Sequence, residues 1–125
     1  MEALLSGVKR LGLDLDEEQI GLFQRYFQEL VEWNRRINLT SVDQWDKVQR
    51  VHFVDSLTII NALPKDVLAN GSLVDVGSGA GFPGLPLKIA FPTLGVTLVE
   101  SVQKKTHFLK HIVSILDLAG VVVLA

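Results

Sequence analysis

Residues 73–84 constrain the fold of this chain more than any other segment. They contain an apolar stretch with one acid, Asp75, followed by three glycines at alternate positions. This pattern predicts a buried strand that runs into a glycine-rich turn, because glycine removes side chains from the inside of a bend and lets backbone touch a ligand. Prolines follow at positions 83 and 86, where the opening turn of a helix tolerates a missing N–H. We therefore predict a strand, a glycine loop and a helix that together hold a nucleotide-like ligand.

Two further strands are predicted after this unit. Residues 96–100 and 121–124 are rich in β-prone side chains, and residues 103–116 between them have one apolar helical face. The order βαβαβ requires a parallel sheet with right-handed crossovers. We therefore predict an α/β fold in which residues 64–125 form the first half of a doubly wound domain.

Residues 1–63 are predicted to form an N-terminal helical extension. Asp16 and Gln19 make a capping box ahead of a long amphipathic helix, and a shorter helix before it ends at Gly12. Ser41 is a candidate cap for a further helix. The segment 64–72 is rich in turn residues, so we predict it to be the connection into the sheet.

Length and composition favour a small globular protein of the cytoplasm. The 125 residues are 48% hydrophobic, which is enough for a core, and they contain no apolar run near the ~20 residues that span a bilayer. The N-terminus lacks the basic start of a secretory signal, and the absence of cysteine fits a reducing compartment. We expect no metal site, because His107 and His111 have no acidic third ligand at helical spacing.

Charge gives no general argument for nucleic acid, since the formal net charge is −2. Any contact with RNA is therefore expected through small patches. The candidates are Lys104 and Lys105, which disfavour the start of a helix unless an anion compensates, and Arg35 and Arg36, which follow Trp33. For both pairs, solvated surface residues are the alternative interpretation.

The residues around the glycine turn distinguish two classes of ligand. A dinucleotide fingerprint of the form GxGxxG requires a third glycine at position 82, which is Phe82. Here Asp75 stands two residues before Gly77, and Glu100 stands 100 − 77 = 23 positions after it. An acid in each place suits S-adenosylmethionine, whose ammonium Asp75 can bind and whose ribose hydroxyls Glu100 can bind. The predicted cofactor site also includes the remaining loop glycines and the residue after Glu100, namely Gly79, Gly81 and Ser101.

The last residues, Val121–Leu124, are predicted to form an apolar strand with a bare edge. Such an edge pairs readily with another strand. We expect the chain to be a fragment, and the alternative is a strand-edge partner or self-association at Val121–Leu124.

Three segments carry a family resemblance: Trp33–Ser41, His52–Leu57, and Asp75–Leu87 together with Leu98–Ser101 and Lys104–Leu109. On these residues the chain resembles the bacterial small-subunit rRNA guanine-N7 methyltransferase family, called RsmG or GidB. The first two segments are more specific to the family than the glycine loop, which by itself indicates only a methyltransferase. The resemblance covers about residue 15 to the end.

The resemblance implies a Rossmann-like class I methyltransferase domain preceded by a helical extension. It implies methyl transfer from S-adenosylmethionine to a guanine N7 of small-subunit rRNA, with the rRNA or the ribosomal subunit as partner. By motif match, Gly77 and Phe82 fall on cofactor positions of the family. One departure is Val51, which stands where the family tends to have a basic residue, with Arg50 one step earlier.

The family's adenine-contacting segment and its active-site arginine lie beyond residue 125. We therefore expect this chain to be an inactive N-terminal portion, and no catalytic residue is identified in it. An NAD-type oxidoreductase domain and a non-catalytic cofactor- or RNA-binding module remain the alternatives, and Phe82 counts against the first of them.

Overall fold

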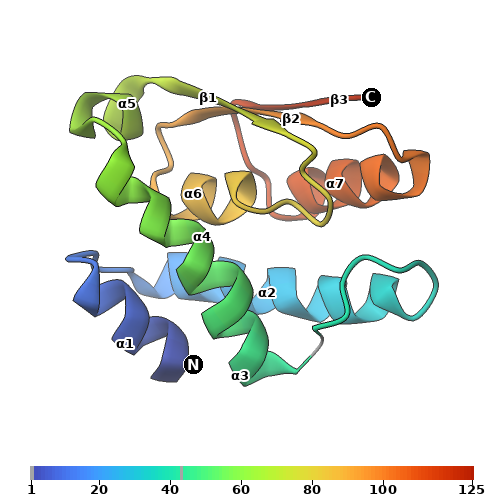
Figure 1. The fold of residues 1–125 in the computed structure, drawn as a ribbon, viewed down its shortest axis with the longest axis horizontal. Coiled ribbons are helices and arrows are strands. Elements are labelled where there is room, and N and C mark those ends of the chain that lie inside the picture. The colour runs from blue at the N-terminus through green and yellow to red at the C-terminus, as the bar shows by residue number, and fades with distance from the viewer. Residues whose placement is uncertain (1, 43) are drawn as a thin grey trace.

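The chain forms a three-stranded parallel sheet with helices packed on one face, as a computed structural model shows (Figure 1). The structure describes residues 2–42 and 44–125. The strands lie in the order β1 (Ser72–Val76), β2 (Gly95–Val99) and β3 (Val121–Leu124), and both pairs are parallel. The predicted βαβαβ order and the α/β class are confirmed.

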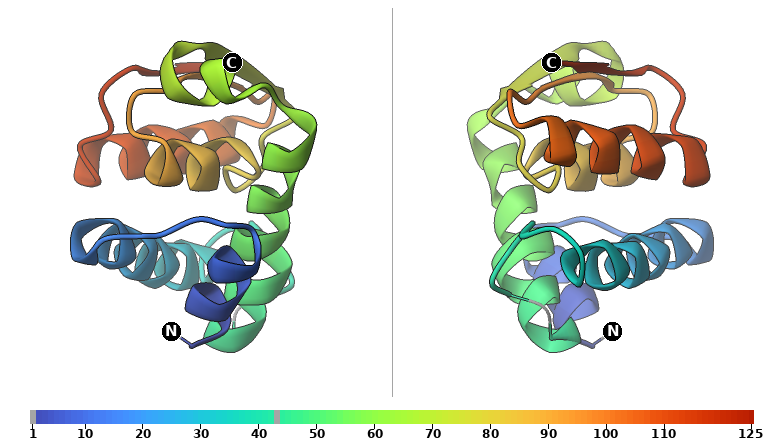
Figure 2. Two further views of the ribbon diagram at one scale, coloured as in Figure 1. Left: turned by 90° about the vertical axis from the view of Figure 1, so that its left-hand side faces the viewer. Right: turned by 90° about the vertical axis from the view of Figure 1, so that its right-hand side faces the viewer.

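Helices α6 (Gly84–Ala90) and α7 (Gln103–Ile115) cover one face of the sheet, and α2 (Glu17–Asn34) packs beneath them (Figure 2). The predicted capping box of α2 is present, since Asp16 and Gln19 each accept a bond from the other's backbone N–H, at 2.8 and 2.9 Å. The Gln19 amide also donates to the Ile89 carbonyl at 3.0 Å. The start of α2 is therefore fixed against the end of α6.

Residues 45–62 form a continuous helical run whose winding changes three times. It consists of α3 (Trp45–Lys47), the π-helix η1 (Val48–Val54), α4 (Asp55–Leu57) and the 3₁₀ helix η2 (Thr58–Ala62). The prediction that Ser41 caps this helix was wrong. The Thr40 hydroxyl accepts the Val42 N–H at 3.1 Å, and this local turn delays the helix until after Gln44, whose side chain makes no capping bond.

The predicted connection at residues 64–72 contains a helix, α5 (Lys65–Asn70), which the sequence analysis did not anticipate. Pro64 sits at the N-cap and loses no hydrogen bond in that place, and the Gly71 N–H closes the end by donating to the Val67 carbonyl at 2.8 Å. Leu68 is buried, and this apolar contact stabilises a helix in a segment whose turn residues gave no sign of one.

One hydrophobic core joins both predicted parts of the chain. Phe23 and Leu30 from α2, Leu85 from α6, Leu98 from β2 and Phe108 from α7 are all fully buried in it. The short helix α1 (Glu2–Arg10) adds Leu4, whose backbone N–H donates to the buried Gln49 side chain at 2.9 Å. The boundary between residues 63 and 64 remains a prediction.

The uncovered face of the sheet is apolar. Val74, Val76, Val122 and Leu124 are 61%, 78%, 52% and 50% exposed, and they belong to the two outer strands. Among the helices that the structure describes, none combines the length and the apolar character that a bilayer crossing requires.

Candidate functional site

The glycine loop lies where β1 and β2 end, on the carboxyl side of the sheet. The N–H groups of Gly77 and Ser78 both donate to the Val99 carbonyl, at 2.8 and 3.1 Å, so the loop starts as an extension of the strand pairing. The Ser78 hydroxyl donates back to the Asp75 carbonyl at 2.9 Å. This edge of a parallel sheet is where α/β proteins bind ligands.

The three alternating glycines have different surroundings. All have positive φ, at 76° for Gly77, 58° for Gly79 and 104° for Gly81, a region that side chains disfavour. A Cβ on Gly77 or Gly79 would meet nothing within 4 Å, whereas one on Gly81 would lie 2.5 Å from the Tyr26 hydroxyl. The first two glycines therefore leave an open cradle, and the third permits α2 to pack against the loop.

Glu100 holds the loop from the end of β2. Its carboxylate is 6% exposed and accepts the N–H of Gly79 through Oε1 and the N–H of Val102 through Oε2, each at 2.8 Å. The bond from Val102 is the largest cause of a lowered pKa for Glu100; the bond from Gly79 and the charge of Lys105 act in the same direction. Glu100 is therefore an ionised carboxylate directly beside the open cradle.

Asp75 faces helix α6, under the loop. Its Oδ2 accepts the N–H of Gly84, the first residue of α6, at 3.0 Å, and the residue is 7% exposed. Burial raises the pKa of Asp75, and the charge of Glu100 adds to that rise. The two acids predicted to bind the ligand thus share one site and have opposite pKa shifts.

Phe82 connects the loop to the helical run. Its ring is stacked on the imidazole of His52, with ring centroids 4.4 Å apart and planes 8° apart, and it also lies over Tyr26 at 5.7 Å. The Nε2 atom of His52 lies 2.9 Å from the Thr40 hydroxyl. The three segments that carry the family resemblance therefore meet through Thr40, His52 and Phe82.

His52 is half-buried and hydrogen-bonded to Thr40, and sequence reasoning missed its stacking on Phe82. Burial lowers the pKa of His52, partly offset by the charge of Asp55. Ser101 is exposed beyond β2, as is Val102. The structure thus places Ser101 beside the Glu100 carboxylate, and its predicted role toward a ligand remains a prediction.

The four candidates for RNA contact lie in two places. Lys104 is exposed and Lys105 is half-buried at the start of α7, where Glu100 supplies the anion that the helix start requires. Arg35 forms an ion pair with Glu32 at 3.4 Å.

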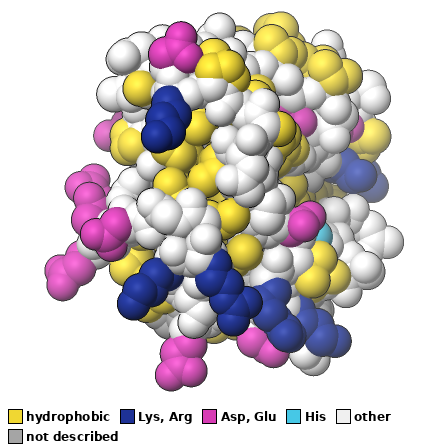
Figure 3. Space-filling model, turned by 60° about the vertical axis from the view of Figure 1, so that its left-hand side comes forward, with side chains coloured by type: hydrophobic (Ala, Val, Ile, Leu, Met, Phe, Trp, Pro, Cys, Tyr) yellow, Lys and Arg dark blue, Asp and Glu magenta, His cyan; other side chains and the backbone are white. Residues whose placement is uncertain are grey.

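Arg36 lies 5.4 Å from the centre of the Trp33 ring, in a cation–π contact. On another face, Lys and Arg side chains gather along the lower edge, over the N-terminal helices (Figure 3). Sequence reasoning did not single out that group.

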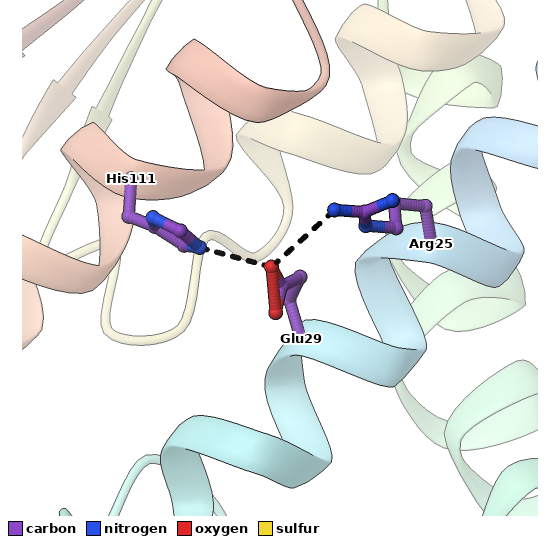
Figure 4. Close-up of polar contacts among 3 residues, drawn as sticks. All are labelled: Arg25, Glu29 and His111. Carbon is purple, nitrogen blue, oxygen red and sulfur yellow. Dashed lines mark hydrogen bonds and ion pairs between the residues drawn. The ribbon is translucent and has the colours of Figure 1, made fainter.

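A polar contact joins α2 to α7. Glu29 on α2 accepts from Nε2 of His111 at 3.0 Å and forms an ion pair with Arg25 at 3.9 Å (Figure 4). Trp33 packs on the same imidazole, with ring centroids 5.1 Å apart. His111 is therefore engaged by the extension, and residues 2–42 and 44–125 contain no group of three or more potential metal ligands.

Comparisons with known proteins agree with this arrangement. The family model described as rRNA small subunit methyltransferase G, GidB, matches residues 19–125. The Ribosomal RNA small subunit methyltransferase G of Dehalococcoides mccartyi is 46% identical over 125 residues, which are 100% of this chain and 52% of that protein. Its namesake from Roseiflexus sp. is 49% identical over 124 residues, 99% of this chain and 52% of that protein. The chain spans about half the length of the curated relatives it matches.

Proposed function

This chain belongs to the rRNA small subunit methyltransferase G family, and on that premise we propose that it serves the S-adenosylmethionine-dependent methylation of a guanine N7 in small-subunit rRNA. The observation that carries the proposal is the open cradle at Gly77 and Gly79 beside the ionised Glu100. Neither the family match nor the relatives support the NAD-type oxidoreductase alternative.

The residues around the cradle fit S-adenosylmethionine, which supplies an electrophilic methyl group on a sulfonium. Glu100 accepts the Gly79 N–H through Oε1 and the Val102 N–H through Oε2, and the Ser101 N–H also acts on the carboxylate; we assign its remaining acceptor capacity to ribose hydroxyls. Asp75 gives Oδ2 to Gly84, and we assign its other oxygen to the cofactor ammonium. Ser101 is assigned to the adenosine end, and Phe82 borders the cradle on the side of the helical run.

The proposed reaction depends on positioning. Guanine N7 carries a free lone pair at neutral pH, so attack on the methyl group needs alignment of two bound molecules and no general base. The bonds of Glu100 to Gly79 in the loop and of Asp75 to Gly84 at the start of α6 hold the two ends of this turn and support that alignment on the cofactor side.

The proposed partner is small-subunit rRNA, which places the protein in the cytoplasm. Lys104, Lys105, Arg35 and Arg36 remain candidates for phosphate contacts, Lys104 most directly because it is exposed and the structure gives it no acidic partner among the described residues. The bare edge at Val121–Leu124 remains a proposed contact strand for a partner or a second copy.

Calorimetric titration tests the proposed cofactor. We expect S-adenosylmethionine to bind this chain and NAD not to bind. We also expect Glu100→Ala to weaken binding at least about tenfold, because it removes the ribose acceptors and frees Gly79. Asp66→Ala on α5, an exposed acid outside the loop, is the matched control and should leave binding unchanged. Binding of NAD in place of S-adenosylmethionine would overturn the proposal.

The prediction that this chain alone is inactive has its own test. Small ribosomal subunits lacking the methyl group are incubated with the chain and labelled S-adenosylmethionine. Label in guanine N7 would contradict the prediction of inactivity while supporting the proposed function.

A further inference from the structure

A hollow of about 390 Å³ lies between the helical run and the residues that follow the glycine loop. One side is formed by His52, Asp55 and Ser56, and the other by Phe82 and Pro83. The volume exceeds what one nucleobase needs and lies within the range of small-molecule sites. The hollow therefore begins one residue after the glycine loop, at Phe82, and its lining combines flat rings, aliphatic side chains and polar groups.

The rings at the hollow are positioned before any ligand arrives. The 8° angle and 4.4 Å separation make His52 and Phe82 a parallel pair, and the Thr40 hydroxyl fixes the far edge of the imidazole. Because Phe82 is also stacked on Tyr26, the face available to a base is that of His52, and proteins use flat rings of this kind to stack an unpaired base. Val51 at the rim is 52% exposed and adds apolar surface beside them.

The polar side of the hollow carries one uncommitted carboxylate. Asp55 is exposed, and among the described residues its carboxylate has neither a hydrogen bond nor an ion pair. Its backbone carbonyl accepts the Thr58 hydroxyl at 2.6 Å, and the neighbouring Ser56 hydroxyl donates to the His52 carbonyl. The serine is thus already engaged, and Asp55 is the group left to receive a ligand's donors.

We propose that this hollow receives the target guanine, with Asp55 accepting the base's N1–H and N2–H groups beside the His52 and Phe82 rings; this inference rests on the proposed function. Among the RNA bases, guanine alone presents two adjacent donors that match both oxygens of a carboxylate. Adenine offers a donor and an acceptor on the same edge, and the acceptor would face the carboxylate. Asp55 is therefore the specificity residue of the proposed site.

The orientation of the base follows from its chemistry. N7 lies on the edge of guanine opposite N1 and N2, so a base held by Asp55 leaves N7 free for the methyl group. In A-form RNA, N7 lies in a deep, narrow groove, and enzymes that modify a base move it out of the stack and bind its Watson–Crick edge in a pocket. A pocket on the helical run also gives the extension a direct part in choosing the substrate.

Titration of the ¹⁵N-labelled chain with guanosine 5′-monophosphate, inosine 5′-monophosphate and adenosine 5′-monophosphate, followed by NMR, tests this assignment. We expect the guanine nucleotide to shift amides of residues 51–59 and Phe82, and to bind at least about fivefold more tightly than the adenine nucleotide. The inosine nucleotide, which lacks the N2 amine, should bind with intermediate affinity.

Two variants distinguish a specific role of the Asp55 carboxylate from the general effect of removing one negative charge. Asp55→Asn should reduce the preference for guanine over adenine to within about twofold, whereas Asp66→Asn, the matched control on α5, should preserve it. Circular dichroism verifies that each variant is folded. If a variant does not fold, the titration of the unchanged chain with the three nucleotides still tests the inference. Equal affinity for the two purines, shifts confined to other residues, or an unchanged preference in Asp55→Asn would each overturn the inference.

The cofactor measurement distinguishes this inference from the proposed function. If S-adenosylmethionine binds the glycine loop and guanine shows no preference at Asp55, the inference fails and the proposed function stands. If S-adenosylmethionine does not bind, the proposed function fails first.

Discussion

The helical run of residues 45–62 and the glycine loop of residues 77–81 meet at Phe82, yet different forces hold them. The run is fixed by packing of aromatic side chains from distant parts of the chain. The loop is fixed by backbone N–H groups that reach acceptors on two neighbouring strand ends. The candidate site therefore combines two parts. The glycine loop follows from residues close to it in the sequence, whereas the helical run depends on contacts with residues that are distant in the sequence.

Phe53 is the centre of the packed half. It is fully buried, and its ring lies 4.9 Å from that of Phe23, 5.3 Å from that of Tyr26 and 6.1 Å from that of Phe82. Gln44, the N-cap residue of the run, makes no side-chain capping bond. The winding of the run changes between α, π and 3₁₀ geometry. Irregular winding brings no local hydrogen-bonding advantage, so we attribute these changes to the packing of side chains such as Phe53 in this cluster.

The largest expected effect comes from emptying this cluster. Phe53→Ala should lower the free energy of unfolding by about 3–5 kcal/mol, because it removes a large buried ring and leaves a cavity between α2 and η1. Urea denaturation measures the loss. Val51→Ala, on the same helix but exposed, is the matched control and should change stability by less than about 0.5 kcal/mol. A loss below about 1 kcal/mol in Phe53→Ala would show that local helix propensity, and not packing, holds the run.

This contrast explains how far the sequence predicted the structure. Strand, loop and helix at residues 72–90 follow from alternating glycines, apolar runs and proline, which act within a few residues. The contact of His52 with Phe82 joins residues 30 positions apart, 82 − 52 = 30, and no periodicity predicts it. Membership of both residues in segments that carry the family resemblance was the one available signal.

One wrong prediction and one helix that was not anticipated have the same origin at smaller scale. Ser41 has the chemistry of a helix cap, but the Thr40 hydroxyl takes the local backbone N–H first. Turn residues at 64–72 predicted only a connection, but a proline and a glycine also begin and end a helix when an apolar residue such as Leu68 is buried between them. Composition alone does not distinguish these outcomes.

Two loop glycines sharpen the comparison between the loop and the packed aromatic cluster, because Gly81 contacts Tyr26 of that cluster and Gly77 does not. Alanine at Gly77 should cost about 1–2 kcal/mol, the cost of holding a side chain at φ 76° in open space. Alanine at Gly81 should cost about 3 kcal/mol, since its Cβ also meets the Tyr26 hydroxyl and Leu85. Thermal and urea unfolding of the two variants measure the difference. Equal losses would mean that the loop is not held by contact with α2.

The smallest effect concerns the two acids that hold the loop, and it has opposite signs for them. Hydrogen bonds lower the pKa of Glu100 from its ordinary 4.5, so the stability it contributes is present above that pH. As pH falls below about 4.5, the unfolded chain binds the proton first and this stability is lost. Burial raises the pKa of Asp75 from its ordinary 3.8, so the folded chain retains that proton longer, and stability is lost as pH rises through the raised pKa.

Urea unfolding between about pH 3 and pH 7 separates the two acids. The stability difference between the unchanged chain and Glu100→Gln should shrink as pH falls, because the unchanged chain loses the advantage of its carboxylate. For Asp75→Asn, which keeps an oxygen for the Gly84 N–H, the unchanged chain should lose stability relative to the variant as pH rises from about 4. Parallel slopes for the two variants would mean that the acids share one environment, whereas opposite slopes show that hydrogen bonds favour the ionised form of Glu100 and burial favours the protonated form of Asp75.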